Sequence, residues 1–251
     1  MKKAKLTFLW VESRIGGFMG GRITTIGFDA DDTLWQNEHF FQNTQGHFTA
    51  LLADYADPDH LAERLEAAER RNLGRYGFGI KGFVLSMIET AIEVTGERVP
   101  ARVIREIVEA GQEMLAHPIH LIDGAAEAIE ALAPDHTLVL VTKGDLIDQE
   151  RKLAQSGLGE MFDAVEIVSD KTRATYSTAF ARHGTGAQAA LMVGNSLKSD
   201  VIPALEAGAW GVHVPHDLTW SFEHAEPPVA HPRFARIDGL GALPALVAQL
   251  G

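Results

Sequence analysis

Three aspartates stand close together near the start of the chain, directly behind an apolar run. Residues 26–35 read IGFDADDTLW, so Asp29, Asp31 and Asp32 fall within four positions. Like charges at this spacing repel one another, and aspartate is a poor strand residue. Carboxylates in such a place can hold a hard cation, accept a phosphoryl group on oxygen or transfer a proton. The cluster is therefore the first candidate for a chemical site.

Three kinds of structure would explain this cluster. A polar turn is one, because aspartate and threonine favour turns and helix N-caps. An EF-hand calcium loop starting at Asp29 is excluded, because it would need glycine in place of Leu34 and glutamate in place of Phe40. A magnesium and phosphoryl-transfer site needs only one or two carboxylates beside the oxygens of the substrate. We favour this third explanation, and the polar turn stays open.

Short apolar runs alternate with helical patterns along most of the chain. Strands are expected at residues 22–28, 136–142, 164–169, 189–194 and 209–214. Several of these runs are almost continuously apolar, which is typical of parallel strands covered on both faces. The helical patterns between them often end in glycine, the usual helix stop. The alternation predicts an α/β fold with a doubly wound, parallel, Rossmann-like sheet.

One long segment interrupts this alternation. Residues 36–121 contain no convincing strand and carry apolar residues at the spacings of three and four that indicate helices. We therefore expect a helical domain at 36–121, inserted into a core formed by residues 22–35 and 122–251. Residues 1–21 are expected to be an N-terminal extension, with translation from Met19 as the alternative.

The composition is that of an ordinary globular protein, with 46% apolar and 22% charged residues. The net charge of -12 argues against broad binding to nucleic acids or anionic membranes, which requires a positive surface. The chain has no cysteine, which excludes disulfides, thiolate nucleophiles and cysteine-ligated zinc. No apolar stretch approaches the roughly 18 residues of a membrane span. We expect a cytoplasmic protein that binds neither nucleic acid nor membrane; no oligomeric state follows from the sequence.

Three further motifs follow the aspartate cluster, each near a predicted strand end. LVTKGD contains Thr142, VSDKT contains Lys171, and VGNSLKSD contains Asn195 and Asp200. Together with DADDT at residues 29–33, which fits the pattern D-x-D-x-T, they resemble in order the four motifs of haloacid dehalogenase-like (HAD) hydrolases. The resemblance covers about residues 22 to 215 and is closest to phosphatase-type members with a helical cap of the C1 type.

The resemblance implies a role for each matching residue. Asp29 would attack phosphorus, and Asp31 would protonate the leaving group and then activate water, while its backbone carbonyl binds Mg²⁺. Asp32 is expected to stabilise the loop. The fourth motif often begins with an acid, and Asn195 in that place supplies an amide oxygen without charge. The implied phosphate-binding residues are Thr142, Lys143 and Lys171, and the implied metal ligands are Asp29, Asp31, Asp200 and Asn195.

The resemblance also implies an activity. It indicates a Mg²⁺-dependent phosphatase that hydrolyses a small phosphorylated metabolite through an aspartyl-phosphate. Asp31 favours phosphoryl transfer over dehalogenation, because 2-haloacid dehalogenases and phosphonatases of this family lack an acid at that position. A phosphomutase would share every core residue and is the alternative. A non-catalytic relative used for binding or regulation is the third possibility.

Two segments outside the motifs could contribute to substrate binding. The predicted cap contains a basic stretch with Arg70, Arg71, Arg75 and Lys81 and no acid. It could reach an anionic substrate, or it could be a solvated helix end and loop, and both interpretations stay open. Residues of the tail that could line the mouth of the site, or simply pack beneath the tail, are Trp220, Phe222 and His224.

Overall fold

The computed structural model describes residues 22–250, so the predicted N-terminal extension lies outside the described residues. Its core is a six-stranded sheet in the order β3-β2-β1-β4-β5-β6, and every neighbouring pair is parallel. This confirms the predicted doubly wound sheet. The strands are β1 (Thr25–Phe28), β2 (Thr137–Lys143), β3 (Ala164–Val168), β4 (Ala190–Gly194), β5 (Trp210–His213) and β6 (Phe234–Arg236).

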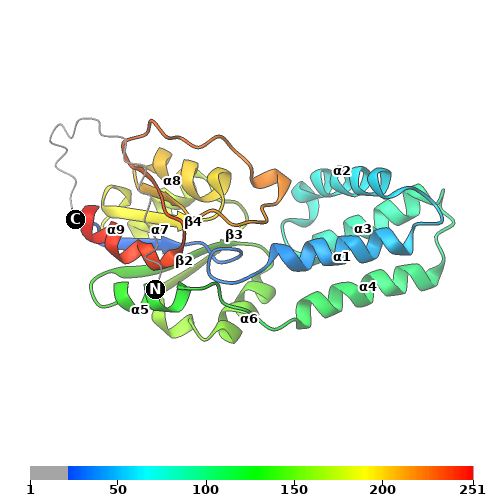
Figure 1. Ribbon diagram of the computed structural model, residues 1–251, viewed down its shortest axis with the longest axis horizontal. Coiled ribbons are helices and arrows are strands. Elements are labelled where there is room, and N and C mark those ends of the chain that lie inside the picture. The colour runs from blue at the N-terminus through cyan, green and yellow to red at the C-terminus, as the bar shows by residue number, and fades with distance from the viewer. Residues whose placement is uncertain (1–21, 251) are drawn as a thin grey trace, which may run out of the picture.

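Helices cover both faces of the sheet (Figure 1). Alternate residues of one strand face opposite ways, so Leu138 and Leu140 pack into one apolar cluster and Val139 and Val141 into the other. Gly27 in β1 is needed for close packing, because a Cβ there would lie 2.9 Å from the sulfur of Met192. The first cluster includes residues of α5 (Ala125–Leu132) and α9 (Leu243–Leu250); the second includes residues of α7 (Arg173–His183) and α8 (Ile202–Ala207).

The chain leaves the sheet after β1 and forms a separate group of helices before it returns. These helices lie beside the sheet rather than on either face (Figure 1). They bury an apolar cluster of their own, which includes Phe48, Leu65, Met87 and Ile107. The segment at 36–121 is therefore helical, as expected, and its function as a substrate-selecting cap remains a prediction. Its helices are α1 (Glu38–Leu51), α2 (Pro58–Tyr76), α3 (Ile80–Val94) and α4 (Ala101–Ala116).

The two ends of this helical unit lie next to each other. Trp35 and Leu121 form an isolated antiparallel bridge. Two backbone hydrogen bonds flank it, from Gln36 N to His120 O and from Ile122 N to Leu34 O, both 2.9 Å long. The unit therefore leaves and re-enters the core at one place.

The carboxyl ends of β1 and β4 border the point where the chain changes direction within the sheet. From β1 the chain adds β2 and β3 on one side, and then β4, β5 and β6 on the other. Ligands of open α/β sheets bind in the crevice at such a point. Among the described residues, no helix is long and apolar enough to cross a membrane.

Candidate active site

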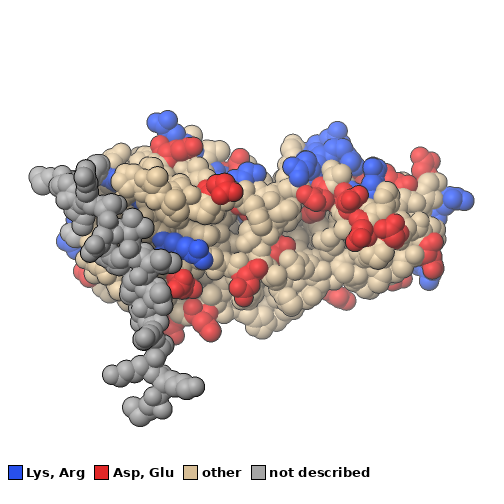
Figure 2. Space-filling model, turned by 45° about the horizontal axis from the view of Figure 1, so that its top comes forward, with Lys and Arg blue, Asp and Glu red and all other residues tan. Residues whose placement is uncertain are grey.

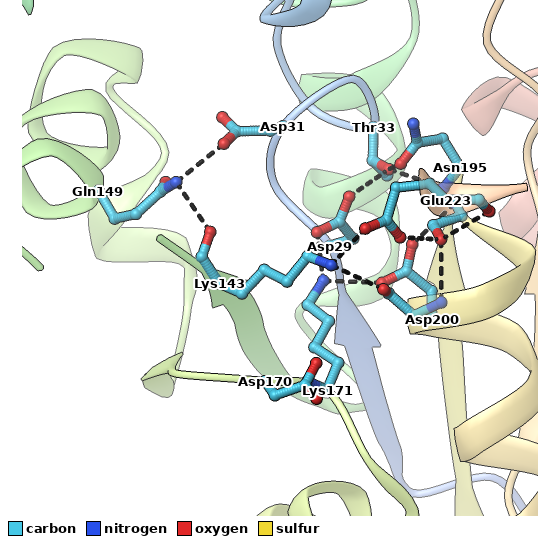
Figure 3. Close-up of polar contacts among 12 residues, drawn as sticks. Asp29, Asp31, Thr33, Lys143, Gln149, Asp170, Lys171, Asn195, Asp200 and Glu223 are labelled. Atoms are coloured by element: carbon cyan, nitrogen blue, oxygen red, sulfur yellow. Dashed lines mark hydrogen bonds and ion pairs between the residues drawn. The ribbon is translucent and has the colours of Figure 1, made fainter. Parts of the chain in front are cut away.

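Asp29 follows directly after β1 and is 6% exposed. Its Oδ2 accepts a 2.9 Å hydrogen bond from the hydroxyl of Thr33, and its Oδ1 accepts one from Lys171 Nζ. Lys171 also donates to Asp200 Oδ1 at 2.7 Å, so one buried ammonium joins two buried carboxylates (Figure 3). Three predicted residues from three different loops thus converge at the switch point of the sheet.

The charges of this group strongly affect one another. Burial, with the neighbouring charge of Asp200, raises the pKa of Asp29 to about 7, although Lys171 opposes the shift. Burial alone would lower the pKa of Lys171, but Asp200 and Asp29 outweigh it and raise that pKa above its ordinary value. Lys171 is therefore protonated at neutral pH. Its single positive charge does not fully offset the charges of the two carboxylates.

Asp200 is positioned by the chain after β4. It lies in a π-helical turn, Leu197–Val201, and its Oδ2 accepts a 2.9 Å hydrogen bond from the backbone of Ser196. Gly194 makes this approach possible, because a Cβ there would lie 2.2 Å from that same oxygen. Asn195 is held by its backbone N–H, which donates to the hydroxyl of Thr33 at 3.0 Å.

The donor types around Asp29 fit a hard cation. Carboxylate oxygens of Asp29 and Asp200 and the amide of Asn195 border one cavity, and oxygen ligands of these kinds suit Mg²⁺. Burial and the charge of Asp200 raise the pKa of Asp29, and a bound cation would favour its ionised form. Within residues 22–250, however, no three His, Cys, Asp or Glu side chains form a preorganised metal cluster. A metal here would therefore depend on ligands other than side-chain carboxylates as well.

Asp31 does not point at Asp29 but away from it, toward α6 (Leu146–Ser156) (Figure 3). Its carboxylate accepts hydrogen bonds from Trp35 Nε1 at 2.7 Å, Gln149 Nε2 at 2.8 Å and Lys152 Nζ at 2.9 and 3.1 Å. Burial would raise the pKa of Asp31, but Lys152 and the hydrogen bonds from Gln149, Lys152 and Trp35 together lower it. None of these three partners was predicted from the sequence, because no motif there marks a side chain that contacts Asp31.

Asp32 connects the aspartate loop to the helical unit. Its Oδ1 accepts from the backbone N–H of Asn37 at 2.8 Å and of Glu38 at 3.0 Å, at the start of α1. Asp32 is 7% exposed and adopts a left-handed backbone conformation, with φ of 59°. These contacts agree with the expectation that it stabilises the loop.

Replacing Asp32 by alanine should lower the free energy of unfolding by about 1–2 kcal/mol, the usual cost of losing a helix cap. The left-handed backbone adds to the loss, because asparagine and aspartate tolerate this conformation better than alanine. Asp32→Asn keeps one acceptor oxygen and should lose less. Urea unfolding of both variants measures the difference, and equal losses would contradict a capping function for this side chain.

The remaining predicted residues also reach the cavity. Thr142 at the end of β2 is buried and lines the cavity, as does Lys143. Lys143 Nζ pairs with Glu223, donates to Ser199 Oγ at 2.8 Å and lies 4.1 Å from the ring centre of Phe78. Glu223 was missed at the sequence level, since it lies in a tail without a recognisable motif.

The cavity lies between the sheet edge and the helical unit and has a volume of about 160 Å³. A space of this size holds a small organic molecule. Its wall includes the core residues described above, residues of α1, α2 and α3, and Trp220 from the tail. Trp220 packs against Phe222 with ring centres 4.5 Å apart, so the tail both lines the site and packs beneath it. His224 is exposed and does not line the cavity.

The four basic residues of the stretch in the helical unit do not line the cavity. Arg70 pairs with Glu66, Arg71 with Glu93 and Lys81 with Asp145. Figure 2 shows blue and red side chains interleaved on the outside of this unit. All four basic residues are exposed, which agrees with their interpretation as a solvated surface.

Comparisons with known proteins agree with this architecture. A model of haloacid dehalogenase-like hydrolases matches residues 23–208. A haloacid dehalogenase-like family hydrolase from Xanthomonas campestris is 42% identical, with 93% of this chain and 94% of that chain covered and a TM-score of 0.83. No match to a protein of curated function reaches significance.

Two more distant solved structures share the fold. YfnB from Bacillus subtilis, a proposed HAD-hydrolase solved with bound magnesium, is 21% identical over 90% of this chain and 99% of that chain, with a TM-score of 0.60. L-2-haloacid dehalogenase from Xanthobacter autotrophicus is 18% identical over 91% of this chain and 100% of that chain, with a TM-score of 0.58. The motifs, the sheet and the family match lead to one conclusion: the chain belongs to the haloacid dehalogenase-like hydrolases and is an enzyme of that family.

Proposed function

We propose that this hydrolase is a Mg²⁺-dependent phosphatase that acts on a small phosphate monoester. The observation that carries the proposal is the group of Asp29, Lys171 and Asp200, in which a buried nucleophile candidate contacts a buried ammonium. Thr142 and Lys143 border the same cavity and supply a hydroxyl and a second cation for phosphoryl oxygens. Asp31 favours phosphoryl transfer over dehalogenation, because an alkoxide leaving group needs a proton donor and a halide does not.

The proposed reaction proceeds in two steps. An oxygen of Asp29 attacks phosphorus, the phosphorus–oxygen bond to the alcohol breaks, and the leaving oxygen takes a proton from Asp31. Asp31 then takes a proton from water, whose oxygen attacks the phosphorus and releases inorganic phosphate from Asp29. Lys171 stabilises the negative charge that develops on the phosphoryl oxygens. Bound Mg²⁺ would be held by Asp29, Asp200, Asn195 and the backbone of Asp31 and would supply Lewis-acid stabilisation.

The position of Asp31 adds a condition to this mechanism. In the structure its carboxylate is held by Trp35, Gln149 and Lys152 and points away from Asp29. Proton transfer to the leaving group therefore requires this side chain to turn toward Asp29 when a substrate is bound and to take up a proton from solvent, because Lys152, Gln149 and Trp35 lower its pKa in the present position. The hydrogen bonds to α6 must be exchanged for bonds at the reacting oxygen.

Purified protein should release phosphate from p-nitrophenyl phosphate when Mg²⁺ is present, and EDTA should stop the reaction. Adding excess Mg²⁺ after EDTA should restore it, because the chelator removes the ion without altering the carboxylates. A steady-state assay of p-nitrophenol release measures all three conditions. Activity that is unchanged by EDTA would contradict the dependence on a metal.

Product assays on the same purified protein distinguish the competing activities. A phosphomutase would convert a sugar phosphate into an isomeric ester without net release of phosphate. A dehalogenase would release chloride from 2-chloropropionate and leave phosphate esters intact. A non-catalytic relative would do neither.

A further inference from the structure

We infer that the substrate of this site carries an ammonium group on the part that leaves with the ester oxygen. This inference rests on the proposed phosphatase function and names the chemical class of its substrate, an amino-bearing phosphate monoester. It follows from the distribution of charge in the cavity. The lysines that line the cavity come from the core, whereas the side facing the helical unit, called the helical end here, is lined by carboxyl and amide groups of that unit and by none of its lysines, arginines or histidines.

Every cation that lines the cavity comes from the core, although Lys152 Nζ also donates to Asn37 at the start of α1 and Lys143 Nζ lies over the ring of Phe78. Three lysines and no arginine or histidine line it among the described residues. Lys171 lies between Asp29 and Asp200, Lys143 pairs with Glu223, and Lys152 pairs with Asp31. The phosphate end is thus supplied with positive charge, and within the described chain no cation remains for a second anionic group at the other end.

Two carboxyl groups line the helical end, one from α1 and one from α2. Glu38, Phe41 and Gln45 share one face of α1, because they are spaced by three and four residues. Glu69 lines the cavity from α2. Within residues 22–250, neither Glu38 nor Glu69 is in an ion pair with lysine, arginine or histidine.

Burial and neighbouring carboxylates disfavour the charged form of both groups. Burial, followed by the charge of Glu38, raises the pKa of Glu69 to about 8. Burial, followed by the charge of Asp32, raises the pKa of Glu38 to about 7. A cation bound at this end would relieve both effects, whereas an anion would increase them.

A buried amide near Glu69 lacks a donor to its oxygen, as does the amide of Gln149, which lines the cavity from α6. Asn72 follows Glu69 by one helical turn, lines the cavity and is 1% exposed. Its Nδ2 donates to Glu89 at 2.9 Å and to Ser86 at 3.2 Å, which fixes the orientation of the amide. Its Oδ1 is buried without a hydrogen-bond partner, and such an atom is costly unless something donates to it.

The wall between these polar groups is aromatic. Phe41, Phe78, Phe83 and Trp220 line the cavity. Aromatic faces attract ammonium groups, and acceptor oxygens bind their N–H bonds. This combination favours an ammonium over a carboxylate or a second phosphate, both of which would face two carboxyl groups and an amide oxygen.

The test uses three esters of equal chain length that differ only at the far end: 3-aminopropyl phosphate, propyl phosphate and the phosphate ester of 3-hydroxypropanoate. With Mg²⁺, kcat/KM should be at least about tenfold higher for the amino ester than for the propyl ester, the size of one charge-assisted hydrogen bond. The carboxylate ester should be the poorest substrate. Equal values for the amino and propyl esters, or a preference for the carboxylate, would overturn the inference.

Variants locate the preference at the helical end. Glu69→Gln should reduce the ratio of kcat/KM for the amino ester to kcat/KM for the propyl ester by about tenfold, because it removes the charge and keeps the shape. Glu63→Gln makes the same change six residues earlier on α2, at an exposed position outside the cavity, and should leave the ratio unchanged. A ratio that Glu69→Gln does not alter would contradict the assigned site.

A binding measurement keeps this inference separate from the proposed function. Titration calorimetry of the three esters into Asp29→Asn protein ranks their affinities without turnover, and the amino ester should again bind most tightly. If p-nitrophenyl phosphate is hydrolysed but no ester is preferred in either assay, the inference fails and the phosphatase function stands. If no ester is hydrolysed, the phosphatase function fails, and the order of affinities still decides whether this end of the cavity binds ammonium.

Discussion

Asp29→Asn should lower the proposed phosphatase activity at least about 10³-fold, because it removes the oxygen that would attack phosphorus. The amide keeps the size of the side chain and can still accept from Thr33, which donates to Asp29 Oδ2 at 2.9 Å. The fold should therefore survive while the chemistry is lost. Release of p-nitrophenol by wild type and variant, together with circular dichroism, measures both properties.

Asp54→Asn is the matched control for this experiment. Asp54 is exposed and does not line the cavity, so the same change of charge should leave the rate unaltered. A variant at Asp29 that retained most of its activity would eliminate this residue as the nucleophile. Loss of activity in both variants would point to a general effect of charge.

Lys171→Met should lower the free energy of unfolding at neutral pH by about 3–5 kcal/mol, the usual cost of breaking a buried ion pair by removing one partner. Lys171 is 5% exposed and contacts the carboxylates of both Asp29 and Asp200. Without it, two buried carboxyl groups face each other, and at least one must take up a proton. Urea unfolding followed by fluorescence measures the loss.

The control for this prediction is Lys81→Met. Lys81 pairs with Asp145 at 2.9 Å, but its side chain is 54% exposed, and ion pairs of this kind contribute about 0–1 kcal/mol. A loss at Lys171 no larger than that at Lys81 would show that the buried pair is not a source of stability. Activity of Lys171→Met should also fall, because the cation that stabilises the phosphoryl oxygens is missing.

The sheet was predictable because its sequence signals are local. Five strands lie within a few residues of their predicted ranges. Only β6 was not predicted. This strand has three residues, Phe234–Arg236, and follows a segment with several prolines. No apolar run therefore indicates it in the sequence.

The core residues of the site were predictable because four motifs at strand ends must meet at one edge of a parallel sheet. Asp29, Thr142, Lys171 and Asp200 all border one cavity, as the motifs predicted. The direction of a side chain does not follow from a motif. Asp31 turns toward α6 because Lys152, Gln149 and Trp35 offer it hydrogen bonds there, and only the packing of α6 brings two of these groups within reach.

The helical end of the cavity was the least predictable part. Glu38 and Glu69 are ordinary residues of amphipathic helices in the sequence, and nothing in their spacing indicates that they face the same space. Their proximity depends on how α1 and α2 pack against each other around Phe48 and Leu65. The basic residues of α2 were considered as substrate-binding residues instead. In the structure, Arg70 and Arg71 pair with acids on the outer surface.

The bridge between Trp35 and Leu121 also has a consequence for how such an enzyme can diversify. The helical unit begins and ends at one point of the core. Its length and sequence therefore do not affect the spacing of the strands that hold the reacting groups. A lineage, or a protein engineer, can exchange the whole helical unit and keep the strands that hold the reacting groups. The constraint on such exchange is the hydrogen bonding of Asp32 to the first turn of α1, which any incoming unit would have to reproduce.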